Sequence, residues 1–179
     1  MNRYLQTIYG KYNLTPLISQ LDRDYFDNIL QLLSRVEGYY RTLPMTETVV
    51  KYNNILEKNS PVLIEAIRFR KENMMPYIED LVGKVTTQHN CSMCSGNCDV
   101  GHRLKMAEFG NTWKLVKDAV VDLKSSLPGI HDAEIGGCIK VLHSEVTFCY
   151  NAVNELIYIE EHILTPKILE AQKMINAQS

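Results

Sequence analysis

Residues 89–102, HNCSMCSGNCDVGH, bring three cysteines and two histidines into a short stretch of the chain. Thiolates and imidazoles are the ligands that zinc prefers in proteins, and thiolates also hold iron–sulfur clusters. The cysteines follow the spacing C-x2-C-x3-C, and a histidine lies four residues after the last of them. The spacing predicts a metal site, occupied by zinc or an iron–sulfur cluster, with His89 as an alternative fourth ligand. The predicted metal ligands are Cys91, Cys94, Cys98 and His102.

The geometry of this segment favours convergence of its side chains. A C-x2-C turn brings two sulfur atoms close enough to share one ion, and Gly96 tolerates the left-handed backbone of such a turn. Asp99 is a candidate N-cap for a following helix, in which Cys98 and His102 would be about one turn apart. Two other readings stay open: a redox-active thiol pair, and reduced surface thiols without a role.

Composition limits the class of protein. The chain has 179 residues, of which 45% are hydrophobic and 22% charged, so we expect one soluble globular domain over residues 1–179. The net charge of -2 makes nucleic acid a poor partner. No apolar run reaches the ~20 residues of a membrane helix, and the first residues lack the apolar centre of a signal peptide. We therefore expect a cytoplasmic protein with reduced thiols and no membrane partner.

Apolar residues recur at intervals of three and four along most of the chain, which is typical of amphipathic helices. The pattern predicts long helices over residues 15–38, 60–81 and 132–165, and another that begins near Asp99 and ends before 125–129. Ser60-Pro61 reads as a capped helix start, preceded by a short helix over 46–57. Four such helices bury their apolar stripes most simply in an all-α antiparallel four-helix bundle. The Cys-rich loop, at about 85–102, would join the second and third long helices.

The segment around Pro76 allows two further predictions, one on the course of the helix and one on its solvent-exposed face. Proline within a helix predicts a kink, or a break one residue earlier. The basic residues at 68–71 read as a solvated helix face. These basic residues are Arg68, Arg70 and Lys71.

Three residues of the last helix share one face, because Cys138, Cys149 and Glu160 are spaced eleven residues apart. Eleven residues at about 100° each return to within about 20° of the starting direction. This direction is close to the apolar stripe, so we expect both cysteines to be small core residues. An inward carboxylate at Glu160 would need a hydrogen-bond partner, a cation or a proton, unless it lies on the rim of the bundle.

Two segments of the chain are alike: RKENMMPYI at 70–78 and EEHILTPKI at 160–168 both have proline in seventh place and isoleucine in ninth. This pattern resembles the Glu-Glu-x-x-Leu-Phe-Pro signature of the hemerythrin-like cation-binding family. Residues 150–166 are especially similar to the closing helix of members linked to iron–sulfur repair and nitric oxide stress. The resemblance implies a four-helix bundle with an internal repeat.

The ligand positions of that family are only partly matched here. The family places histidine four residues before a metal-binding glutamate, whereas the corresponding pairs in this chain are Ala66 with Arg70 and Leu156 with Glu160. Only Glu160 matches, so a di-iron centre is not expected. Tyr25 lies near the place of the first-helix histidine, and Tyr25 and Glu160 are therefore the candidate cofactor-binding residues of the interior.

The leading hypothesis is a metal-binding helical bundle that senses or handles metal, redox or nitrosative stress. One alternative is a protein-interaction module in which zinc only pins the loop, with a protein partner. Another is a hemerythrin-like iron protein or ligand sensor with an interior pocket around Glu160 and Tyr25. A bundle enzyme that uses this carboxylate and phenol as acid and base is the less expected form of that alternative, because the sequence shows no nucleophile–base pair and no phosphate-binding loop.

Overall fold

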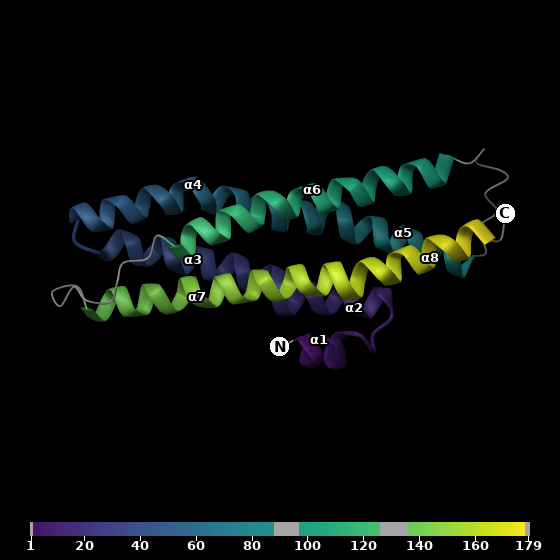
Figure 1. The fold of residues 1–179 in the computed structure, drawn as a ribbon, viewed down its shortest axis with the longest axis horizontal. Helices are drawn as coiled ribbons and strands as arrows, with labels where there is room; N and C mark the ends of the chain where they lie inside the picture. The colour runs from purple at the N-terminus through teal and green to yellow at the C-terminus, as the bar shows by residue number, and fades with distance from the viewer. Residues whose placement is uncertain (1, 88–96, 126–135, 178–179) are drawn as a thin grey trace.

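The computed structural model describes residues 2–87, 97–125 and 136–177. Every regular element within these residues is a helix (Figure 1). The prediction of an all-α chain is confirmed. No helix in the described ranges is both long enough and apolar enough to cross a bilayer.

The first long helical run is composed of α2 (Leu14–Leu21), η1 (Asp22–Phe26) and α3 (Asp27–Thr42). It begins one residue before Thr15, so Pro16 lies in the first turn, where its missing N–H costs no hydrogen bond. A short helix that the apolar pattern did not reveal, α1 (Asn2–Tyr9), precedes this run and packs on α7 (Gly136–Ile159).

The second run contains α4 (Glu47–Phe69), η2 (Arg70–Met74) and α5 (Met75–Thr86). The predicted helix start at Ser60-Pro61 is wrong, because α4 continues through Pro61. Ser60 is buried inside the helix, and the cap lies at Thr46, whose hydroxyl accepts from the Val49 amide at 3.3 Å.

The third run is α6 (Asn97–Ser125), and the fourth contains α7 (Gly136–Ile159), η4 (Glu160–Leu164) and α8 (Thr165–Ala177). α6 begins two residues before the expected cap at Asp99. The fourth run extends well beyond the expected end at residue 165, since the chain stays helical through Pro166.

Three of these runs contain a π-helical turn, in which an amide bonds to the carbonyl five residues earlier. η2 and η4 lie just before Pro76 and Pro166, and they belong to the two similar segments of the sequence. Proline has no N–H, and its ring clashes with the carbonyl four residues before it, so a widened turn allows the helix to continue. The chain is not broken before Pro76, because it continues from the π turn η2 into α5. η1 has no following proline, so proline is not the only cause.

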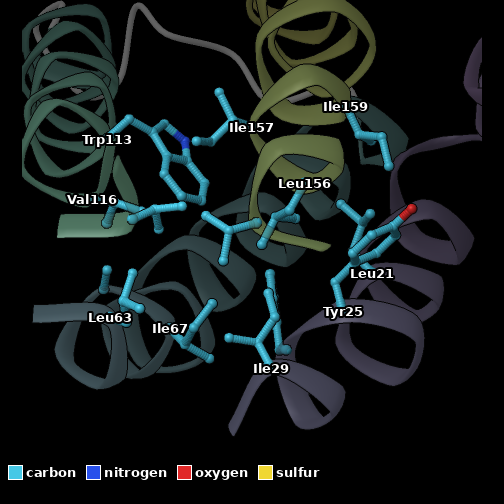
Figure 2. Close-up of a cluster of buried hydrophobic side chains, with 14 of the residues drawn as sticks. Leu21, Tyr25, Ile29, Leu63, Ile67, Trp113, Val116, Leu156, Ile157 and Ile159 are labelled. Atoms are coloured by element: carbon cyan, nitrogen blue, oxygen red, sulfur yellow. The ribbon is translucent and has the colours of Figure 1, made fainter. Parts of the chain in front are cut away.

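The four long runs lie side by side along the longest axis of the molecule (Figure 1). α3 packs on α7, α4 on α6, α5 on α8 and α2 on α5. Their buried faces form one apolar cluster, part of which is shown in Figure 2. Within it, Trp113 of α6 and Tyr25 of η1 approach from opposite sides of the core layer (Figure 2).

Candidate functional site

The two similar segments meet inside the molecule through their first residues, Arg70 of η2 and Glu160 of η4. The Arg70 Nε lies 3.0 Å from Glu160 Oε1 and 3.2 Å from Oε2. Arg70 is 0% exposed and Glu160 4%. Of the two positions that the sequence left open for Glu160, inward or on the rim, the structure shows the inward one, whereas the solvated position predicted for Arg70 is wrong. The sequence did contain a signal, because Arg70 lies on the apolar stripe between Ile67 and Met74.

α6 completes this buried site with Trp113 and Thr112. The Trp113 indole Nε1 donates to Glu160 Oε2, and the Arg70 guanidinium carbon lies 3.4 Å from the centroid of the Trp113 ring. Arg70 Nη1 donates to the Ala66 carbonyl at 2.9 Å and to the Thr112 hydroxyl at 3.0 Å. The remaining nitrogen, Nη2, has no acceptor among the described residues, although the indole face attracts the cation.

Burial and pairing act in opposite directions on the two charges. Burial raises the pKa of the Glu160 carboxyl, while the Arg70 guanidinium and the hydrogen bonds from Arg70 and Trp113 lower it. Burial lowers the pKa of Arg70, and Glu160 raises it. Each group is the counter-ion that the other needs in a buried site, so the pair carries no net charge.

A cavity of about 250 Å³ opens beside Glu160. Glu160, Thr165 and Trp113 form its polar wall, and most of the other lining residues are apolar. Gly110 and Glu161, which are both exposed, lie on its rim, so the cavity has a mouth between α6 and η4. The apolar lining residues are Met74, Met106, Phe109, Leu164 and Ile168.

No family model, curated protein or solved structure matches this chain. Function must therefore be inferred from the chemistry of its own residues. That chemistry does not fit a di-iron centre. Arg70 stands where the hemerythrin-like pattern would need a ligand, and a guanidinium donates hydrogen bonds but has no lone pair for a metal. The described residues contain no cluster of three or more His, Cys, Asp or Glu side chains suited to a metal ion.

Tyr25 belongs to a different polar cluster from Glu160. Its hydroxyl donates to Glu155 Oε2 at 3.0 Å, and its ring centroid lies 5.9 Å from that of Tyr9. The Tyr9 hydroxyl in turn donates to Asp24 Oδ2 at 2.9 Å. This cluster joins α1, η1 and α7, so the structure does not bring Tyr25 and Glu160 together as the sequence suggested.

The predicted metal site is only partly within the described ranges. Cys91 and Cys94, together with His89, lie outside the described residues. Cys98 and His102 lie in α6, four residues apart, which places the two positions about one helical turn from each other.

The two remaining cysteines are in α7. Cys149 is buried, as expected for a core residue, and burial raises the pKa of its thiol to about 12. Cys138 is exposed, so the prediction that it is a core residue is wrong. Cys138 and Cys149 are spaced so that they lie on the same face of α7. Cys138, however, belongs to the first turn of the helix, at the end of the bundle.

Proposed function

We propose that this protein is a metal-binding helical bundle whose Cys-rich loop holds zinc or an iron–sulfur cluster. The observation that carries the proposal is the set of three cysteines within eight residues, followed by a histidine at helical spacing. The proposed ligands are Cys91, Cys94, Cys98 and His102. Four sulfur and nitrogen ligands suit tetrahedral zinc, and a thiolate-rich set also suits an iron–sulfur cluster.

The positions of the surrounding helices support this assignment. α5 ends at Thr86 and α6 begins at Asn97, so the Cys-rich loop joins the second run to the third. Positions 98 and 102 follow at once on helical backbone, four residues apart. A pair at this spacing on a helix is a common way to present two ligands to one ion, because the positions share a face.

We further propose that the four runs form an antiparallel bundle of the hemerythrin-like type, with a role in sensing or handling metal, redox or nitrosative stress. The two π turns before Pro76 and Pro166 support an internal repeat. The Arg70–Glu160 ion pair occupies the interior position where this type of bundle would hold a metal. We therefore place the metal in the Cys-rich loop alone.

The test is metal quantification with a visible absorption spectrum, on protein purified without oxygen. We expect about one zinc per chain and no colour, or iron with sulfide and a brown protein. The Cys91/Cys94/Cys98→Ser variant should lose the metal, whereas Cys138→Ser, which removes an exposed thiol elsewhere, should keep it. A metal content near zero in the native protein, or equal in all three proteins, would contradict the proposal.

A second candidate function, ligand binding in the interior, is favoured by a separate observation. The cavity beside Glu160 combines a buried carboxylate with aromatic and sulfur-containing walls. Sites for small molecules typically pair mostly apolar walls with a few placed polar groups.

A further inference from the structure

We infer that the cavity beside Glu160 binds a small, uncharged, mainly apolar molecule that donates one hydrogen bond to the Glu160 carboxylate. This inference rests on the second candidate function, ligand binding in the interior, and does not depend on the proposed metal loop. It rests on the size of the cavity, on the charge balance of its polar wall, and on the residues that line it.

The volume limits the size of the ligand. An apolar protein cavity of about 150 Å³ is large enough for benzene. The cavity here, at about 250 Å³, has room for a ring that carries a short substituent. It is smaller than the ~300–1,000 Å³ of pockets that take drug-sized ligands.

The charge balance of the wall selects an uncharged ligand. Arg70 already neutralises Glu160 at 3.0 Å. On the rim, Lys117 pairs with Glu161 at 2.8 Å. A cationic or anionic ligand would find no unpaired counter-ion among the described residues of the lining. The structure therefore predicts discrimination against both charged classes.

The carboxylate still has acceptor capacity for a neutral donor. An ionised carboxylate offers about four lone-pair sites. The described donors to Glu160 are two nitrogen atoms, Arg70 Nε and Trp113 Nε1. Because Glu160 also lines the cavity, a hydroxyl of a bound molecule can donate to it from that side.

The other walls favour an aromatic or branched apolar body. Phe109 and Trp113 offer ring surfaces, and aromatic pairs gain stability in tilted or edge-to-face geometry. Met74 and Met106 supply flexible, polarisable side chains, which adapt to ligands of different shape.

The experiment uses Trp113 as the reporter, since it is the single tryptophan of the chain and lines the cavity. Its fluorescence is followed while the full-length protein is titrated with benzyl alcohol, benzyl methyl ether, benzylamine or benzoate. The ether keeps the ring but lacks the donor, and the last two carry opposite charges at neutral pH. We expect a saturable change with benzyl alcohol. The ether should bind about tenfold more weakly, because a hydrogen bond to a charged group is worth at least that factor. The two charged compounds should bind at least as weakly as the ether, because they would find no unpaired counter-ion among the lining residues that the structure describes.

Two glycine variants locate the binding. A Cβ built at Gly110, on the rim, or at Gly83, on α5 outside the cavity lining, meets nothing within 4 Å. Gly110→Leu should therefore fold, fill the mouth of the cavity and abolish the saturable change. Gly83→Leu makes the same chemical change in a helix and should leave the titration intact.

The results that would overturn the inference are distinct. Absence of a saturable signal with benzyl alcohol, or equal binding of the ether, would refute a donor-recognising site. Unchanged binding in Gly110→Leu, or equal loss in Gly83→Leu, would refute its location. None of these results alters the metal content of the loop, so the two proposals fail separately.

Discussion

A fully buried arginine requires a counter-charge, and in this molecule Arg70 has Glu160 on one side and the Trp113 ring against its face. Replacing such a pair by apolar residues is often nearly neutral, whereas removing only one partner leaves a buried charge uncompensated. The contribution of this pair to stability must therefore be measured with single and double variants, because each partner compensates the buried charge of the other.

Removal of the Glu160 charge alone should be costly. We expect Glu160→Leu to lower the free energy of unfolding by about 3–5 kcal/mol, and a double Arg70→Met, Glu160→Leu variant to recover most of that loss. Urea denaturation measures both.

The exposed pair between Arg68 and Glu65 is the matched control. Their side chains are 53% and 67% exposed, and Glu65→Ala should change the free energy of unfolding by less than about 1 kcal/mol. If Glu160→Leu costs no more than Glu65→Ala, Arg70 does not depend on Glu160.

The two cysteines of α7 should differ in reactivity. Burial raises the pKa of the Cys149 thiol to about 12, so at pH 8 almost none of it is thiolate, the form that reacts. In a Cys91/Cys94/Cys98→Ser background, we expect alkylation of exposed Cys138 in the native protein and of Cys149 only after unfolding. Mass spectrometry identifies the modified residue, and equal labelling of both would contradict the burial of Cys149.

That raised pKa also gives the sign of a stability change with pH. The unfolded thiol, with an ordinary pKa near 9.0, loses its proton before the folded one does. Protonated Cys149 therefore contributes stability below pH 9 that is lost as pH rises towards about 12. A Cys149→Ala variant should lose less stability than the native protein over this alkaline range, as measured by urea denaturation.

At the scale of single elements, the sequence predicted the apolar faces better than the ends of the helices. In the helix predicted over residues 15–38, the apolar residues that recur at intervals of three and four, such as Ile18, Tyr25 and Val36, are buried, because spacing alone decides which residues share a face. Ser60-Pro61 misled the prediction, since a serine before proline resembles a cap even within a continuous helix. The π turn η1 left no sequence signal, because neither proline nor glycine marks it.

The helical glycines offer a test of the element boundaries. A Cβ at Gly38 in α3 or at Gly83 in α5 meets nothing within 4 Å, so each glycine-to-alanine change should stabilise the fold by up to about 1 kcal/mol.

Gly10, just after α1, should respond in the opposite way. A Cβ there would lie 2.5 Å from the backbone oxygen of Gln6, to which the Gly10 amide also donates. Gly10→Ala should lower the melting temperature, while Gly38→Ala and Gly83→Ala raise it. A rise in all three would contradict the tight turn at the end of α1.

At the scale of the whole molecule, local periodicity could be predicted from the sequence, whereas long-range contacts could not. The all-α class followed from amphipathic periodicity along nearly the whole chain. The buried ion pair could not be predicted from the sequence, because it joins residues 90 positions apart. Arg70 also lies close to Arg68 and Lys71, and such a group of basic residues is typical of a solvated helix face. The Cys-rich loop remains a prediction from spacing.

If zinc only stabilises the loop, its removal should act on stability alone. Structural zinc contributes free energy to folding, so a chelator should lower the melting temperature of the native protein. The same chelator should have no effect on the Cys91/Cys94/Cys98→Ser variant, and Trp113 fluorescence with benzyl alcohol should be retained below the transition. An equal shift in both proteins would show that the chelator acts elsewhere.

The most direct test of the proposed metal site is X-ray absorption at the edge of any metal that co-purifies with the protein. For zinc we expect three sulfur neighbours at about 2.3 Å and one nitrogen at about 2.0–2.1 Å, as thiolate and imidazole ligands require. An iron–sulfur cluster would add bridging sulfide and short iron–iron distances. A shell of oxygen and nitrogen neighbours without sulfur would contradict the assignment of the metal to the three loop cysteines.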